Sequence, residues 1–298
     1  MNAVLSLDNI SKSYGPIKAL KNVSFDVPPG TVFGILGPNG SGKTTLLSII
    51  LDVLKANNGS FLWFGQPGSP EQRQRIGSLL ETPNFYHYLS AVDNLKITQS
   101  ISHRGTLEDI DTALKKVNLF DRRKSRFSTY SLGMKQRLAI GAALLGSPKV
   151  LVLDEPTNGL DPVGIAEIRN LIVELKNNGH TIIMASHLLD EVEKVCTHVA
   201  ILKSGTLITT GDVEDVLMDE DLVELKASDL EALAVVVRQF GQDVIINKEQ
   251  GTVLLKLPKG KARPEEINSF CFSQGITLSH LMLKKKRLEA RFFELTNN

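Results

Sequence analysis

In the first thirty residues, apolar and polar positions alternate with the two-residue period of β-strands, at 4–7 and again at 23–27. Proline and glycine at 28–30 are turn-forming residues and end the second strand. A continuous apolar strand is predicted at 31–36, and it leads directly through a glycine-rich turn into a helix. The pattern predicts an N-terminal β-region followed by a strand, turn and helix in immediate succession.

Helical periodicity marks the middle of the chain. At 107–117, apolar residues recur three or four positions apart with charged residues between them, which predicts an amphipathic helix. A second helix is expected at 132–145, because Ser131 can cap its first turn and Gly146 and Pro148 can end it. These helices form an insert in the surrounding β-rich sequence.

A second β-α-β unit follows the helical insert. The segment KVLVLDEP at 149–156 is a continuous apolar strand that ends in two carboxylates, as expected for a strand buried on both faces. A helix at 165–176 and a strand at 181–185 complete the unit. The first 211 residues therefore read as an α/β region with a helical insert.

Beyond residue 211 the predicted elements become shorter. They are a strand at 222–226, a helix at 230–240, strands at 244–247 and 253–257, a helix at 264–274 and a strand at 276–283. The order β-α-β-β-α-β is that of ferredoxin-like domains. We expect two domains, residues 1–215 and a small α+β domain at 216–298.

Composition agrees with a globular protein of this size. The 298 residues suggest one large or two modest domains, because a single core usually stops growing at about 250–300 residues. A content of 42% hydrophobic and 22% charged residues is ordinary for folded domains. The 34 basic and 33 acidic residues nearly cancel, so nothing drives the whole chain toward nucleic acid or an anionic membrane. No nucleic-acid partner is expected.

The cysteines and apolar runs indicate where the protein works. Cys196 and Cys271 have no metal-binding spacing and are expected to be buried, reduced thiols of a cytoplasmic protein. The N-terminus lacks the pattern of a signal peptide, and no run of about 18 apolar residues is present. Any membrane transport is therefore expected to need a partner.

The sequence GPNGSGKT at 37–44 fits the phosphate-loop pattern, in which glycines let backbone amides surround phosphate oxygens at a helix N-terminus. Lys43 would hold the β and γ phosphates of ATP, and the Thr44 hydroxyl would ligate Mg²⁺. The predicted nucleotide-binding residues of this segment are Gly37, Pro38, Asn39, Gly40, Ser41, Gly42, Lys43, Thr44 and Thr45.

Two carboxylates, Asp154 and Glu155, end the second buried strand. Buried carboxylates need a cation or polar partner, and a metal-bound nucleotide supplies one. Asp154 suits a water-mediated contact to Mg²⁺, and Glu155 suits a general base that polarises the attacking water. The alternative is that the two carboxylates cap a helix or form salt bridges at a strand end.

The motif Ser131-Leu-Gly-Met-Lys135 makes a family resemblance specific. Together with the phosphate loop, LDEPTNGLDP at 153–162 and Ser186-His187, it resembles the nucleotide-binding subunit of an ATP-binding cassette (ABC) transporter over residues 3 to about 215. The resemblance implies a P-loop NTPase core with an antiparallel β subdomain and a helical subdomain at about 84–148. YSLGMKQRL is similar to bacterial exporters of the bacitracin-resistance, lantibiotic-immunity and gliding type.

In that family two subunits pair head to tail, so the resemblance implies an ATP-sandwich homodimer. Ser131 and Gly133 at a helix start would offer a hydroxyl, backbone amides and a helix dipole to the γ-phosphate of the partner's ATP. The usual Leu-Ser-Gly-Gly-Gln pattern is altered at Tyr130, Leu132 and Met134, so a glutamine contact is not carried over. A plain capped core helix is the alternative.

The resemblance assigns three further positions. His187 matches the switch histidine, which contacts the γ-phosphate and the attacking water. Asp161 matches the loop through which the two subunits sense one another's sites, although an aspartate before proline also simply forms turns. Tyr14 matches the aromatic residue that stacks on adenine, and ordinary packing at a strand end is its alternative.

Two neighbouring features keep open roles. Glu81 stands where the family usually has glutamine: it would ligate Mg²⁺, face the membrane partner, or simply be exposed. The segment 84–95 concentrates Phe85, Tyr86 and Tyr88, which indicates either a docking groove for the partner's coupling helix or core packing.

The C-terminal sequence at 287–296 resembles the end of the accessory domain on such exporter subunits. The basic residues at 284–287 are read as a solvated face, with contact to anionic lipid as the alternative.

The sequence as a whole predicts an ATP-hydrolysing subunit, cytoplasmic and peripheral on the inner face of the cell membrane. It would power a separate permease of the ABC-2 type and export a peptide, antibiotic or lipid-like substrate. Two rivals remain: a soluble ABC ATPase acting on ribosomes or DNA, and a non-catalytic module that uses ATP only to switch interfaces.

Overall fold

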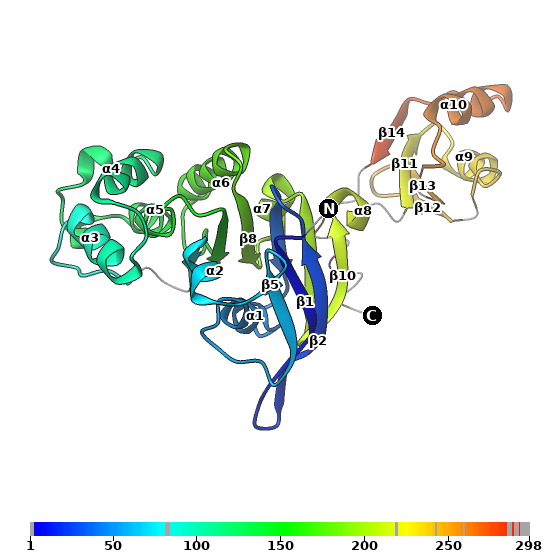
Figure 1. Cartoon of the computed structure of the whole chain (residues 1–298). Helices are drawn as coiled ribbons and strands as arrows, with labels where there is room; N and C mark the ends of the chain where they lie inside the picture. Colours follow the sequence, from blue (N-terminus) through cyan, green and yellow to red (C-terminus); the bar gives the residue numbers. More distant parts are fainter. Residues whose placement is uncertain are drawn as a thin grey trace. The chain divides into compact units, whose positions relative to one another are not determined.

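The chain folds into two compact units, Met1–Val213 and Glu214–Asn298 (Figure 1). The division falls two residues before the boundary that the sequence predicts. The computed structural model describes residues 3–80, 84–217, 220–241, 243–258 and 260–284, together with residues 288 and 292.

The first unit contains an antiparallel sheet with the strand order β2-β1-β4-β5. Its strands are β1 Leu5–Tyr14, β2 Ile17–Val27, β4 Asn58–Trp63 and β5 Gln66–Pro67. The alternating segments at 4–7 and 23–27 lie on one hairpin, in which Leu5 pairs with Val27 and Tyr14 with Ile17. The side chains that alternate inward supply one side of the core.

A six-stranded sheet with the order β10-β9-β3-β8-β7-β6 forms the centre of this unit. Its strands are β3 Val32–Leu36, β6 Ile76–Leu79, β7 Val150–Asp154, β8 Thr181–Ser186, β9 His198–Lys203 and β10 Thr206–Asp212. Only β10 runs antiparallel to its neighbour. Every residue of β3, β7 and β8 is buried, as the continuous apolar runs predict.

Helix α1, Lys43–Ile50, packs between the two sheets. Its apolar face meets Ile35 of the central sheet and Trp63 of the antiparallel sheet in one buried cluster. The Trp63 indole nitrogen donates a hydrogen bond to the Ile50 carbonyl over 2.7 Å. Helix α1 is therefore held by the core on both sides. Three further helices, α2 Pro70–Gln74, α6 Pro162–Asn177 and α7 Leu189–Val195, contact strands of the central sheet.

A helical region is inserted between β6 and β7, and its three helices contact one another (Figure 1). It consists of α3 Ala91–Ser102, α4 Leu107–Lys116 and α5 Leu132–Ala143, with 3₁₀ turns η1 Phe120–Arg122 and η2 Phe127–Thr129. Ser90 caps α3, Thr106 forms a capping box with Asp109, and Ser131 caps α5. The helices predicted at 107–117 and 132–145 are thus present, each slightly shorter than predicted.

Arg104 ties the helical region to the central sheet. Its guanidinium donates hydrogen bonds to the Ile76 carbonyl of β6 and, over 3.2 and 3.1 Å, to the Ala142 and Ala143 carbonyls at the end of α5. Burial lowers the pKa of Arg104 from its ordinary value. One side chain therefore satisfies three carbonyls from two elements.

We expect Arg104→Met to lower the free energy of unfolding of the first unit by about 2–3 kcal/mol, because it leaves buried carbonyls without donors. Urea unfolding measures the change. Arg104→Lys, which keeps a cation but not the planar fork, should lose less. An unchanged midpoint for the methionine variant would show that these hydrogen bonds contribute nothing net.

The second unit is a four-stranded antiparallel sheet with the order β12-β13-β11-β14. Its elements are β11 Glu220–Lys226, α9 Leu230–Val237, β12 Val244–Asn247, β13 Thr252–Pro258, α10 Pro264–Ser273 and β14 His280–Lys284, and α8 Val213–Leu217 precedes them. Alternate strand residues such as Val223 and Leu255 form a buried cluster with Leu233 of α9 and Ile267 of α10.

The strand predicted at 276–283 begins four residues late. Gly275 has a left-handed φ of 77°, and the Ile276 amide donates to the Cys271 carbonyl, so these residues close the end of α10 instead of pairing with a strand. Pairing with β11 begins at His280.

Cys196 and Cys271 are both buried free thiols, as predicted. Burial raises the pKa of each thiol from its ordinary value. In the described part of the chain, none of the helices combines the length and the apolar character needed to cross a bilayer.

Candidate functional site

The phosphate loop between β3 and α1 is shaped by close backbone approaches that only glycine permits. A Cβ atom at Gly37 would lie 2.3 Å from the Ser41 hydroxyl and 2.4 Å from the Leu202 carbonyl oxygen. Gly42 has a φ of 105°, and a Cβ there would lie 2.6 Å from the Ala19 carbonyl oxygen. Gly37 and Gly42, both predicted from the motif, are therefore required by the fold of the loop.

A pocket of about 470 Å³ opens over this loop, a volume typical of small-molecule sites. The sequence predicts seven of its lining residues: Asn39, Gly40, Gly42, Lys43, Thr44, Thr45 and Glu155. It misses five others: Ile17, Lys18, Ala19, Lys21 and Ser204. Lys18 and Lys21 add two cations from β2, so the pocket suits a polyanion.

Lys43 lies at the base of the pocket with 6% of its surface exposed. Its ammonium donates hydrogen bonds to the Gly37 carbonyl over 2.8 Å and the Pro38 carbonyl over 3.3 Å. The Ser41 hydroxyl beside it is buried and makes no hydrogen bond to any described residue. A buried ammonium and an unsatisfied hydroxyl in one loop fit a ligand that brings anionic oxygens.

Glu155 follows β7 in a left-handed conformation with a φ of 47°, which is strained for a residue with a side chain. Its Oε2 lies 2.9 Å from His187 Nδ1, and its Oε1 lies 3.6 Å from Lys43 Nζ. The backbone amide of Glu155 donates to the Ala185 carbonyl of β8, which holds the turn against the neighbouring strand. The structure thus brings together the three predicted catalytic residues, Lys43, Glu155 and His187.

The donors available for a metal ion are oxygen atoms. Asp154 ends β7 with 2% of its surface exposed, and Thr44 presents an exposed hydroxyl in the first turn of α1. Oxygen donors suit Mg²⁺, which usually takes one or two protein ligands together with phosphates and water. Among the described residues, no group of three or more histidine, cysteine, aspartate or glutamate side chains is arranged to hold a metal by itself. The predicted ligand Glu81 lies outside the described residues.

Ser131 and Gly133 lie at the start of α5 and do not line the pocket over the phosphate loop. The Ser131 hydroxyl is exposed and accepts a hydrogen bond from the Met134 amide over 3.3 Å. Tyr130, which departs from the family motif, is 4% exposed and donates its hydroxyl to the Arg122 carbonyl over 2.7 Å. Tyr130 therefore packs into the helical region, while Ser131 and Gly133 remain accessible.

Asp161 and Tyr14 are also separate from the pocket lining within one chain. Asp161 caps α6, with its Oδ1 accepting from the Gly164 amide over 2.9 Å. Tyr14 ends β1 with 48% of its surface exposed, and the Lys12 ammonium lies 5.6 Å from its ring centre.

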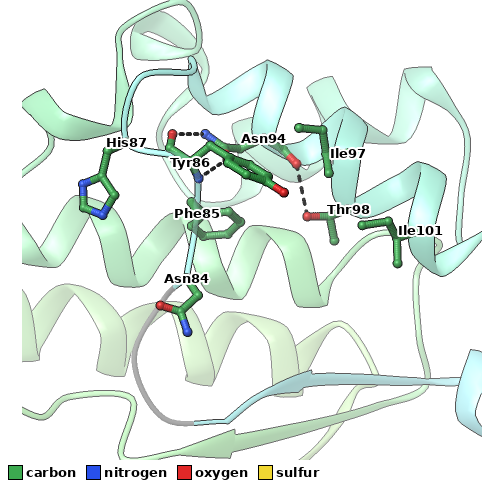
Figure 2. A pocket seen from close by; sticks show the side chains of 8 residues that line it. All are labelled: Asn84, Phe85, Tyr86, His87, Asn94, Ile97, Thr98 and Ile101. Carbon is green, nitrogen blue, oxygen red and sulfur yellow. Dashed lines mark hydrogen bonds between the residues drawn. The ribbon is translucent and has the colours of Figure 1, made fainter.

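A second pocket, of about 500 Å³, lies in the helical region (Figure 2). It is lined by Asn84, Phe85, Tyr86, His87, Asn94, Ile97, Thr98 and Ile101. The Asn94 side chain accepts a hydrogen bond from the Tyr86 amide over 2.8 Å and donates one to the Tyr86 carbonyl over 3.1 Å. The segment before α3 is thereby fixed on the helix and forms one wall of a groove.

The aromatic residues of this segment divide between the two roles that the sequence leaves open. Phe85 is half-buried, and its ring meets that of Phe127 edge-on at 5.3 Å. Tyr86 and Tyr88 remain 51% and 68% exposed. One aromatic residue therefore packs into the region, and two tyrosines stay available to a partner.

Comparison with known proteins places these features in one family. The family described as "ABC transporter" matches residues 20–158. The uncharacterized ABC transporter ATP-binding protein YhcH of Bacillus subtilis is 38% identical over 99% of this chain and 97% of its own length. The lantibiotic transport ATP-binding protein SrtF of Streptococcus pyogenes is 40% identical over 74% of this chain and 95% of its own. The bacitracin transport ATP-binding protein BcrA of Bacillus licheniformis is 33% identical over 99% of this chain and 98% of its own length.

Solved structures agree with the sequence relatives. CbiO1 from Clostridium perfringens, described as part of the ABC transporter complex cbiONQ, superimposes with a TM-score of 0.66 at 31% identity, over 72% of this chain and 91% of its own. A dimeric post-hydrolysis state of the ATP-binding cassette MJ0796, bound to ADP and phosphate, superimposes with a TM-score of 0.62 at 27% identity, over 70% of this chain and 98% of its own. This chain belongs to the family of ABC transporter ATP-binding proteins.

Proposed function

We propose that this chain is the ATP-hydrolysing subunit of a bacterial exporter and powers a separate membrane-spanning subunit of the ABC-2 type. The observation that carries the catalytic part is the convergence of Lys43, Glu155 and His187 beside a glycine-shaped loop. If the loop were only a glycine-rich turn without a ligand, nothing would require the buried Lys43 ammonium and the Glu155 carboxylate 3.6 Å from it.

In the proposed reaction, the loop amides and Lys43 hold the β and γ phosphates of ATP. Mg²⁺, held by Thr44 and Asp154, would neutralise charge that develops on the transferred phosphoryl group. Glu155 accepts a hydrogen bond from the attacking water and takes its proton as the water oxygen bonds to the γ-phosphorus. The bond from the γ-phosphorus to the bridging oxygen breaks, and the products are ADP and inorganic phosphate. His187 orients the Glu155 carboxylate through the 2.9 Å hydrogen bond and reaches the γ-phosphate from the same side.

The accessible Ser131 and Gly133 support a second part of the proposal, a head-to-tail homodimer. Because they start α5 outside the pocket of their own chain, we infer that they complete the ATP site of a second copy. Asp161, at the start of α6, would lie near this junction, and the exposed ring of Tyr14 would stack on the adenine.

The proposed substrate and partner follow from the relatives and the second pocket. SrtF and BcrA are named for transport of a lantibiotic and of bacitracin, so we propose an antibiotic-like peptide or lipid-like substrate. The groove beside α3 supports docking of the membrane subunit, because exposed tyrosines are typical of protein interfaces. Docking there would place the chain on the cytoplasmic face of the cell membrane.

We further infer that residues 1–215 form the nucleotide-binding domain, with a helical subdomain at about 84–148, and that 216–298 form a ferredoxin-like accessory domain. The strand order β12-β13-β11-β14 with two helices on the β-α-β-β-α-β path supports this topology. The alignment with SrtF covers 95% of that relative but only 74% of this chain, which supports a second domain added to a common core.

Reconstitution tests the proposal. The chain, co-expressed with an ABC-2 type membrane-spanning subunit from the same organism and placed in lipid vesicles, should release phosphate and move labelled antibiotic peptide only when ATP is present. Lys43→Ala should abolish both activities. Phosphate release that responds to ribosomes or DNA but not to the membrane subunit would favour the soluble ATPase instead.

A further inference from the structure

His187 lies on a short link whose two ends are held in different ways. Upstream, Ser186 ends β8, is fully buried and pairs with Leu36 of β3 in the central sheet. Downstream, the chain enters α7 at Leu189, and no side-chain hydrogen bond caps the start of this helix. A helix of 7 residues is too short to be stable by itself in water. The position of His187 therefore depends on the contacts that hold α7.

The apolar side of α7 packs on β3, the strand that leads into the phosphate loop. Val192 is fully buried, and a Cβ atom at Gly34 of β3 would lie 3.1 Å from its Cγ1. The Sγ atom of Cys196, the residue that ends α7, would lie 3.0 Å from the same Cβ. These contacts fix how closely the helix approaches the sheet. Apolar packing has no direction of its own, so the rotation of the helix needs another contact.

An ion pair joins the polar side of α7 to α6. Glu191 lies four residues after His187, and its Oε2 accepts a hydrogen bond from Arg169 Nη1 over 3.0 Å. The Glu191 side chain is 15% exposed and that of Arg169 is 28% exposed. Arg169 follows the fully buried Ile168 on the 16-residue helix α6, so its backbone is fixed by the core. A charge-assisted hydrogen bond of defined direction between two helices sets their relative rotation.

Stability alone is a weak explanation for this ion pair. Partly buried charges lose hydration, and an apolar pair of similar size often stabilises a fold equally well. The Lys194 ammonium also donates to the Glu191 carboxylate, over 2.8 Å, but Lys194 lies on α7 itself and is exposed. That contact strengthens the helix without tying it to its surroundings. The Arg169 contact, in contrast, ties α7 to another helix.

We propose that Arg169 and Glu191 are positioning residues for ATP hydrolysis. Their ion pair holds α7 at the rotation that keeps His187 Nδ1 within hydrogen-bonding distance of Glu155. This inference rests on the proposed function, in which Glu155 takes the proton from water and His187 orients its carboxylate. Glu155 itself is held by β8, because its amide donates to the Ala185 carbonyl. Rotation of α7 would therefore move His187 away from Glu155 and open the 2.9 Å contact between them.

The test compares ATP binding with ATP hydrolysis in the full chain. Arg169→Met removes the guanidinium and keeps a long unbranched side chain. It should lower phosphate release in single turnover by about 10-fold, because misplacing a catalytic group by about 1 Å can cost up to about 100-fold. Its affinity for a fluorescent ATP analogue should match that of wild type. Lys194→Met removes the exposed cation from the same carboxylate and should hydrolyse ATP like wild type.

Two combined variants separate positioning from damage to the fold. In His187→Ala the group that the ion pair positions is absent, so adding Arg169→Met should lower the rate no further. Exchange of the two charges, Arg169→Glu/Glu191→Arg, should recover hydrolysis that Arg169→Glu loses, which a misfolded protein cannot do. Because Lys194 also faces position 191, the exchange is made in the Lys194→Met background.

Arg169→Met at the wild-type rate would overturn the inference. So would an equal further loss in the His187→Ala background, loss of ATP binding together with hydrolysis, or a charge exchange that recovers nothing. In these cases wild type still hydrolyses ATP and His187→Ala is slower, so the proposed function stands. A wild type that releases no phosphate, or a His187→Ala variant as fast as wild type, would instead overturn the proposed reaction and the inference with it.

Discussion

Glu155→Gln is expected to reduce ATP hydrolysis by about 10²- to 10⁴-fold while leaving ATP bound, the range that a general base contributes. The amide has nearly the shape of the carboxylate and keeps a hydrogen bond to His187, so the turn after β7 should persist. It cannot take a proton from water. It also removes a negative charge 3.6 Å from Lys43, which should favour the bound triphosphate. Phosphate release and binding of a fluorescent ATP analogue measure the two effects.

The same variant should accumulate as an ATP-bound dimer, because closure no longer leads to hydrolysis. Size-exclusion chromatography with and without ATP detects this species. Glu174→Gln, which neutralises an exposed carboxylate on α6, provides the control and should hydrolyse ATP like wild type. Unchanged turnover in Glu155→Gln would assign the base to another residue.

The phosphate loop could be predicted from sequence because its geometry is set over eight consecutive residues. Gly37 and Gly42 are required by contacts within the loop and with strands on either side, and their spacing is visible in the chain. The buried strands were equally visible, because β7 is apolar up to Asp154 and β8 is apolar from Ile182 to Ala185. In this part of the protein, the local residue pattern therefore predicts both the strands and the phosphate-binding loop between strand and helix.

The lysines of β2 that line the pocket over the phosphate loop could not be predicted from sequence. Lys18 and Lys21 belong to a strand of the other sheet. They are held beside the loop through Gly205, whose carbonyl accepts from the Lys21 amide and whose amide donates to the Ser41 carbonyl. These contacts join residues far apart in the chain. No motif around 18–21 distinguishes these lysines from ordinary solvated strand residues.

Helix α3 and Arg104 were missed for a different reason. Only Ala91, Asn94 and Leu95 of α3 are buried, so its apolar periodicity is weak, and the Ser90 cap was the one local signal for its start. Arg104 looks like any surface arginine until the fold places three carbonyls around its guanidinium. Buried polar contacts of this kind follow from tertiary packing alone.

Gly133→Asp is expected to abolish ATP-driven dimerisation and to reduce hydrolysis by at least about 100-fold, because it places a carboxylate where the partner's γ-phosphate would lie. The subunit itself should fold normally: the nearest heavy atom to a Cβ at Gly133 is Leu160 Cδ2 at 4.0 Å. ATP binding to the chain's own phosphate loop should remain. Ser128→Asp adds the same charge at an exposed position before α5 and should hydrolyse ATP like wild type.

Mixing two inactive variants decides whether the site is shared. A dimer of Gly133→Asp with Lys43→Ala contains one complete ATP site. The Gly133→Asp chain supplies an intact phosphate loop to this site, and the Lys43→Ala chain supplies an intact Ser131 and Gly133. We therefore expect the mixture to regain ATP hydrolysis that neither variant has alone, measured as phosphate release in single turnover. Hydrolysis by folded Gly133→Asp alone at the wild-type rate would instead mean that every ATP is bound and hydrolysed within one chain, and Ser131 would then be only the cap of α5.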